Sequence, residues 1–213
     1  MKTEDLISML ATGTPAVAPG AVASRFAGAL GCGLMGAVLL MAMVFGVRTD
    51  IAQAATLPMF WAKLAMPAVA GLTALSLAMR LSSPGRRPGP APMMLAALLL
   101  LAWIGAGAAL LGAPPAERAE LIFGATWKTC TLNITLLALP LLGAGLWVIR
   151  DLAPTRPASA GASCGLFAGA AAASVYALHC PEMAAPFLAI WYVLGIATPA
   201  VLGALLGPRL LRW

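Results

Sequence analysis

The sequence predicts an all-α integral membrane protein with six transmembrane helices. Of its 213 residues, 62% are apolar and 9% are charged, and the mean hydropathy is +0.94. Soluble domains average about 45–50% apolar and about 25% charged residues, so this chain has too few charged side chains to cover a globule in water. The composition excludes a secreted disulfide scaffold and a disordered tail protein, and it argues against a soluble enzyme.

Each predicted span holds roughly 20 mostly apolar residues, the length that a helix needs to cross the hydrocarbon core of a bilayer. Five spans contain no charged residue, and the second contains only Lys63, near its start. We expect the long side chain of Lys63 to extend to the headgroups. The spans are residues 26–47, 60–79, 93–111, 132–149, 158–178 and 185–206, which makes residues 1–25 a tail and residues 26–213 the transmembrane domain.

The distribution of Lys and Arg predicts that both termini are cytoplasmic. Nine of the 13 fall on the side that holds the two termini and the second and fourth loops, and four fall on the other side. Cytoplasmic loops of membrane proteins carry the excess of these residues. The sequence pI of about 9.7 therefore reports topology, and we expect the chain to contact lipid and no nucleic acid.

The four cysteines fall into two classes, of which the first is structural. Cys32 in the first span and Cys164 in the fifth lie toward the cytoplasmic side, each in a stripe of small residues that favours close helix packing. The stripes are Ser24, Gly28, Cys32 and Gly36 in the first span, and Gly161, Gly165 and Gly169 beside Cys164 in the fifth.

The second class, Cys130 and Cys180, is predicted to lie on the outer side at one depth, because spans four and five are consecutive and antiparallel. Cys130 is near the start of a helix and close in sequence to Lys128, and both features favour a thiolate. Cys180 adjoins His179, the only histidine. A thiolate attacks oxidants, forms disulfides and binds soft metal ions. The residues alone leave open whether the pair is reactive or is a structural disulfide.

A transient metal site is a further prediction at the same place. Cys130, Cys180, His179 and Glu182 together could supply two thiolates, an imidazole and a carboxylate to zinc or cadmium. Their spacing in the sequence matches no established metal-binding pattern. We therefore expect no obligatory cofactor.

The tail begins with a short predicted amphipathic helix. Thr3 is a candidate N-cap, and Glu4 and Asp5 place acidic side chains in the first turn. Three apolar residues share one face of this helix, namely Leu6, Ile7 and Leu10. A helix of this kind either binds a groove on a partner protein or lies on the bilayer surface.

Ionisable residues are absent from the centres of the predicted spans, which argues against ion or proton transport. The sequence also contains no Gly-rich phosphate loop and no Ser/His/Asp set. We expect no catalytic activity.

Several segments form a pattern along nearly the whole chain: TEDLISMLA near the start, PMFWAKL at Pro58–Leu64, the Cys130 segment with ALP at Ala138–Pro140, APTRP at Ala153–Pro157, YALHCPE at Tyr176–Glu182 and the terminal segment Trp191–Trp213. The pattern resembles the NrsF family of bacterial negative regulators of sigma factors. HCPE and GPRLLRW are its more specific parts.

The resemblance implies a six-span anti-sigma factor of the bacterial inner membrane, with an extracytoplasmic-function sigma factor as its partner. The sigma factor would be held by the tail segment that contains Thr3, Glu4, Asp5, Leu6, Ile7 and Leu10. The family's functional cysteine pair faces the periplasm and falls on Cys130 and Cys180, which implies a response to heavy metals or oxidants. Cys32 and Cys164 are additional to the family pattern.

A membrane thiol–disulfide oxidoreductase and a metal exporter are the alternative interpretations. The first would need a second outer thiol pair or a quinone pocket. The second would need intramembrane carboxylates or histidines. The sequence predicts neither feature.

Overall fold

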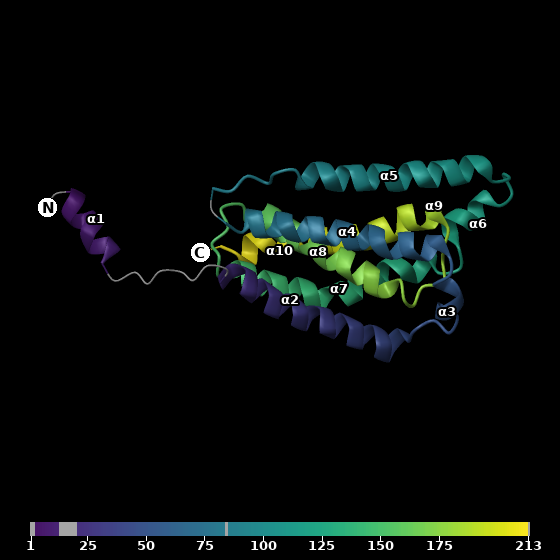
Figure 1. Cartoon of the computed structure of the whole chain (residues 1–213), viewed down its shortest axis with the longest axis horizontal. Coiled ribbons are helices and arrows are strands. Elements are labelled where there is room, and N and C mark those ends of the chain that lie inside the picture. Colours follow the sequence, from purple (N-terminus) through teal and green to yellow (C-terminus); the bar gives the residue numbers. More distant parts are fainter. Residues whose placement is uncertain (1–2, 13–20, 84, 213) are drawn as a thin grey trace.

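The computed structural model describes residues 3–12, 21–83 and 85–212, and every regular element in these residues is helical (Figure 1). Six helices or helix runs are long and apolar enough to cross a membrane, as predicted. The spanning elements are α2 (Ala21–Leu40) with the π-helical turn η1 (Met41–Phe45), α4 (Pro58–Leu81), α5 (Ala91–Gly112), α7 (Trp127–Arg150), α8 (Pro157–Tyr176), and α9 (Ala185–Phe187) with the π-helical turn η2 (Leu188–Tyr192) and α10 (Val193–Leu210).

Three short helices lie outside the bundle: α1 (Thr3–Ala11) in the tail, α3 (Ile51–Ala54) and α6 (Arg118–Phe123). The helix in the tail confirms the prediction, whereas α3 and α6 fall in segments that were expected to be loops. Pro residues begin several of the long helices, including Pro58 in α4 and Pro157 in α8. Proline is favoured there because its fixed φ suits the first turn, where its missing N–H costs nothing.

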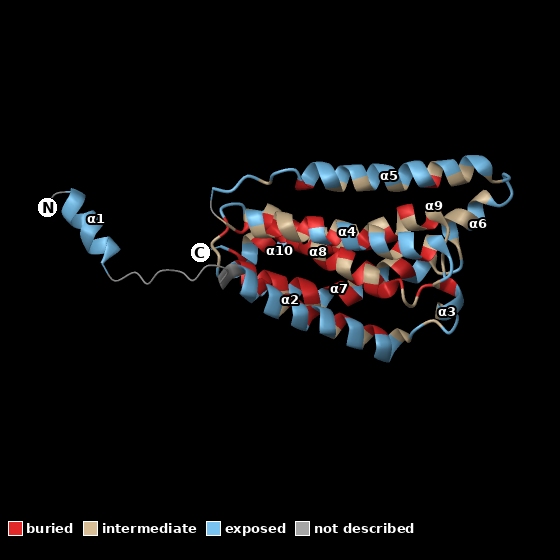
Figure 2. Cartoon of the chain, in the orientation of Figure 1, coloured by how far each residue is buried: buried red, intermediate tan, exposed pale blue. Residues whose placement is uncertain are grey.

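Helix α8 is the centre of the bundle and packs on α10, α4 and α7, while α2 packs on α7. Buried residues concentrate on α7 and α8, and α5 lies at the periphery with most of its side chains exposed (Figure 2). In a membrane protein such exposed apolar side chains face lipid, which is as apolar as they are.

The contact between α8 and α10 is made by backbone atoms. A Cβ atom on Gly161 would meet the backbone of Gly203, one on Gly165 would meet Pro199, and one on Gly169 would meet Ile196. The predicted small-residue stripe of the fifth span is therefore confirmed, and the buried Cys164 lies beside it, against Gly145 of α7.

The predicted stripe of the first span is wrong at Gly28 and Cys32 and holds at Gly36. Cys32 is exposed, and a Cβ atom on Gly28 would meet nothing within 4 Å. Helix α2 instead approaches α7 through Gly33, where a Cβ atom would lie 3.0 Å from the Cα atom of Leu141, and through Gly36, which faces Pro140. The contact face is set by the large residues Phe26, Leu30 and Met41, which are buried on the same side.

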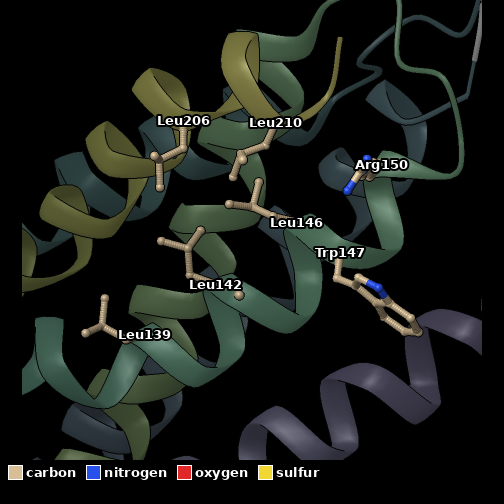
Figure 3. Close-up of a pocket in the computed structure, with 8 residues that line it drawn as sticks. Leu139, Leu142, Leu146, Trp147, Arg150, Leu206 and Leu210 are labelled. Carbon is tan, nitrogen blue, oxygen red and sulfur yellow. The ribbon is translucent and has the colours of Figure 1, made fainter. Parts of the chain in front are cut away.

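The bundle has two distinct ends. At the first, called the termini end, α2 begins and α10 ends (Figure 1), and Arg25 forms an exposed ion pair with Asp151 over 3.8 Å. An apolar groove near this end runs between α7 and α10, with Leu residues along it and Arg150 at its rim (Figure 3). The opposite end, called the thiol end, carries Cys130 and Cys180. Which end faces the cytoplasm stays a prediction.

Candidate thiol site

Cys130 and Cys180 meet at the thiol end, although 50 positions separate them in the sequence. Cys130 lies in the first turn of α7, and Cys180 lies in the loop of residues 177–184 that follows α8, called the thiol loop. Both residues are 0% exposed, and both are free thiols. Their side chains are in hydrogen-bonding contact. The structure therefore brings together the two cysteines that the sequence singled out.

Lys63 holds the thiol loop from the side of α4. Its Nζ donates hydrogen bonds to the backbone oxygens of Cys180, at 2.6 Å, and of Glu182, at 2.7 Å. It also lies 5.4 Å from the centre of the Tyr192 ring. Lys63 is only 2% exposed, so the expectation that it extends to the headgroups is wrong. The backbone oxygens of the thiol loop take no part in helix hydrogen bonds, so they are available inside the protein as acceptors for the Lys63 ammonium.

Arg48, in the segment after η1, is a second cation on the thiol loop. Its guanidinium donates to both carboxylate oxygens of Asp50, at 2.7 and 2.6 Å, and to the backbone oxygen of Cys180, at 3.3 Å. Its backbone N–H donates to the oxygen of Leu178 at 3.1 Å. The hydrogen bond from Arg48 lowers the pKa of the Asp50 carboxyl. This pair fixes the thiol loop to the end of the first span.

The side chain of His179 points toward the first span and away from the point where Cys130 and Cys180 meet. Its Nδ1 atom lies 2.9 Å from the backbone oxygen of Gly46. Its ring packs between Phe45 and Tyr176, with ring centres 5.5 Å away in each case. The imidazole therefore has a structural position between η1 and α8.

Glu182 binds the start of α7. Its Oε1 accepts hydrogen bonds from the backbone N–H groups of Ala125, at 2.8 Å, and Thr126, at 3.2 Å. The carboxylate also lies against Gly124, where a Cβ atom would be 2.6 Å from Oε2 and where φ is +54°. Only glycine combines that close approach with that φ. A negative charge at this place also stabilises the helix N-terminus.

In this structure the four predicted metal ligands do not converge on one point. Cys130 and Cys180 meet, but His179 and Glu182 bind backbone groups of other segments. In residues 3–12, 21–83 and 85–212, no three His, Cys, Asp or Glu side chains are close enough together to hold a metal ion. Sequence proximity was misleading because consecutive loop residues point in different directions.

The capping role of Glu182 gives a first testable prediction. Glu182→Ala removes the acceptor for two N–H groups, and we expect it to lower the free energy of unfolding by about 1–3 kcal/mol. Glu182→Gln keeps an oxygen acceptor and is expected to lose less. Thermal unfolding in detergent measures both variants against the wild type, and equal stability of Glu182→Ala and wild type would contradict the role.

The cation beside the thiols is Lys63, and this differs from the expectation that Lys128 would favour a Cys130 thiolate. Lys128 is exposed and lies over the Trp127 ring, 5.7 Å from its centre. The pKa of the Cys180 thiol is lowered, first by its hydrogen bond with Cys130 and then by the positive charge of Lys63.

Sequence reasoning missed three residues of this site: Lys63, Arg48 and Tyr192. Tyr192 is buried, and its hydroxyl makes no hydrogen bond of normal geometry within the described residues, although it interacts with the Cys180 thiol. Lys63 had one signal in the sequence, because a charge inside an apolar run is costly unless it has a partner. Arg48 and Tyr192 had none.

In the tail, α1 contains all six residues that were predicted to bind a partner, and none of its residues is buried. Ile7 and Leu10 are 61% and 68% exposed. The helix therefore presents apolar side chains that the rest of the described chain does not cover.

Together the fold and the site define a multi-pass membrane protein with a buried pair of free thiols at one end of its bundle. The family model described as "Negative regulator of sigma F" matches residues 10–213. The chain is 48% identical to the probable anti-sigma-F factor NrsF of Azospira oryzae and 38% identical to the anti-sigma-F factor NrsF of Caulobacter vibrioides, and both alignments cover the full length of both chains. No solved structure matches the chain. The chain belongs to the NrsF family, which confirms the resemblance seen in the sequence.

Proposed function

We propose that this protein is an anti-sigma factor that holds an extracytoplasmic-function sigma factor at the bacterial inner membrane and releases it when its thiol pair reacts. The full-length similarity to two proteins named anti-sigma-F factors carries the first part of this proposal. The six membrane-spanning helices support the location, and the excess of Lys and Arg at the termini end supports a cytoplasmic tail.

The sigma factor binds α1 in this proposal. The helix is short, so it has little stability alone in water, and its Leu6, Ile7 and Leu10 side chains are exposed. An amphipathic helix of this kind gains stability when its apolar face enters a groove on a partner. Glu4 and Asp5 add negative charge to the first turn for contact with basic side chains.

The signal in this proposal is a two-electron oxidant such as a peroxide. Oxidation removes two protons and two electrons from Cys130 and Cys180 and forms one S–S bond, while the peroxide is reduced to two molecules of water. The contact between the two free thiols supports this reaction. A soft metal ion such as zinc or cadmium is the less favoured signal, because the predicted imidazole and carboxylate ligands bind other groups.

A change at the pair releases the sigma factor only if the reduced and oxidised states of the bundle bind it with different affinities. The oxidised state ties α7 to the thiol loop by a covalent bond. Helix α7 packs on α2, which leads to the tail. In this proposal, the reduced and oxidised states therefore differ in the position of α7, and α2 carries that difference toward the tail.

Binding through α1 is tested by co-purification of the full chain with its sigma factor from membranes. Leu10→Asp places a charge on the apolar face, and we expect it to reduce the retained sigma factor by about tenfold or more, the cost of burying an unpaired charge. Ser8→Asp is the matched control, because Ser8 lies on the opposite face of the same helix. Equal loss in both variants, or loss in neither, would contradict binding through the predicted face.

A further inference from the structure

We propose that Lys63 is the counter-ion of a thiolate on Cys180 and that Cys180 is consequently the first thiol of the pair to react. The proposal rests on the sensing role proposed above and assigns the order of events within it. Lys63 is a positioning residue in this scheme, because it acts through Cys180.

The argument starts from the charge of Lys63. A buried ammonium is unstable unless it has an anionic partner as well as hydrogen bonds. Lys63 is 2% exposed and makes its two hydrogen bonds to neutral backbone oxygens. Among the described residues, no carboxylate lies within ion-pair distance of its Nζ, since the ion pairs there join Arg25 to Asp151 and Arg48 to Asp50.

The anion must come from the groups that surround Cys180. The titratable and charged groups that face it are Cys130 of α7, Lys63 of α4, Tyr192 of η2, Tyr176 of α8, Arg48 after η1, and Glu182 in the thiol loop. The Glu182 carboxylate is committed to the start of α7. Phenols ionise near pH 10 in water, above ordinary thiols. A charged Lys63 therefore requires one of the two thiols as its anionic partner.

The surroundings favour Cys180 over Cys130. The Nζ of Lys63 is hydrogen-bonded to the backbone of Cys180 itself. The Cys130 thiol is in contact with the Cys180 thiol and can donate a hydrogen bond to it once Cys180 is ionised. The buried Tyr192 hydroxyl, which has no regular hydrogen bond within the described residues, is a further donor beside the same sulfur. The positive charge of Lys63, held at the Cys180 backbone, and the thiol and hydroxyl groups beside the sulfur all favour a negative charge at Cys180.

The consequence is an ordered reaction. The Cys180 thiolate attacks a peroxide oxygen, the O–O bond breaks, and the departing oxygen takes a proton and leaves as water or alcohol. Cys180 is then a sulfenic acid. The sulfur of Cys130 attacks the sulfur of Cys180, its thiol proton joins the departing hydroxide as water, and the disulfide forms.

The test measures thiolate formation in the purified full chain, with Cys32→Ala and Cys164→Ala as background. We expect the ultraviolet absorbance of one thiolate near neutral pH, and its loss in Cys180→Ser. Lys63→Met removes the charge and is expected to shift the titration of this thiolate upward by about one pH unit or more. Lys63→Arg keeps the charge and is expected to restore it, while Lys128→Met is the control that leaves it unchanged. An unchanged titration in Lys63→Met would overturn the proposal.

A second measurement covers the case in which Lys63→Met does not fold. Iodoacetamide alkylates a thiolate by displacing iodide, and peptide mass spectrometry of the wild-type chain gives the rate at each cysteine. We expect Cys180 to react about tenfold faster than Cys130 near neutral pH. Faster alkylation of Cys130 would overturn the proposed order. Neither measurement involves the sigma factor, so a failure here is distinguishable from a failure of the sensing role.

Discussion

Replacing both Cys130 and Cys180 by serine is expected to abolish release of the sigma factor by peroxide while leaving it bound in untreated cells. Serine is close in size to cysteine but forms no disulfide, so the bundle stays in its reduced arrangement whatever the oxidant. The measurement is the amount of sigma factor that co-purifies with the membrane protein before and after peroxide treatment. We expect the treated variant to retain as much as the untreated wild type.

The matched control for this prediction is the variant Cys32→Ala with Cys164→Ala. Cys32 is exposed and Cys164 is buried beside Gly145, away from the thiol loop. This variant keeps the pair and is expected to release the sigma factor like the wild type. Normal release from the Cys130→Ser and Cys180→Ser double variant would show that the signal enters elsewhere.

The substitution Gly165→Val is expected to destabilise the bundle strongly, because Gly165 lies where α8 and α10 touch along their backbones. A Cβ atom at this position would overlap the backbone of Pro199 in α10, and backbone atoms have no rotamer by which to move away. Overpacking costs typically about 1–3 kcal/mol, and separation of two helices in backbone contact brings the cost to the upper part of that range or above it. The measurement is thermal unfolding in detergent, followed by size-exclusion chromatography.

Gly105→Val provides the comparison for Gly165→Val. Gly105 lies in α5, and a Cβ atom there would meet nothing within 4 Å. The same two methyl groups would then point into lipid or detergent, so stability should stay close to that of the wild type. Equal loss in the two variants would mean that valine acts through helix propensity and not through the contact between α8 and α10.

Hydropathy and charge were sufficient to predict the six spans, because each span is defined by the composition of about 20 residues together. The common depth of Cys130 and Cys180 also followed from sequence, since connectivity alone places the start of one helix at the same end as the end of its antiparallel neighbour. The direction of single side chains did not follow. Lys63 turns inward to the carbonyls of the thiol loop, and a hydropathy window does not distinguish that direction from a path to the headgroups.

The separation of the four predicted ligands and the errors at Gly28 and Cys32 of the first stripe have the same physical origin. His179 and Glu182 flank Cys180 in sequence, yet their partners are Gly46 on one side and Ala125 and Thr126 on another. In α2, one residue along the helix is a rotation of about 100°. Cys32 therefore lies on a different face of α2 from the observed contact at Gly33, and the shape of α7 determines which face is used.

Because the thiol loop is attached to residues 46–48, the first span has a connection at each of its two ends. The π-helical turn η1 ends at Phe45, and the next residues bind the loop through Gly46 with His179 and through Arg48 with Leu178 and Cys180. The same span begins at Ala21, next in the chain to the tail. A π-helical turn holds one extra residue within a helix, and such turns are frequent at functional sites. The first span therefore connects the thiol loop at one end of the bundle with the tail at the other, and η1 lies between the two.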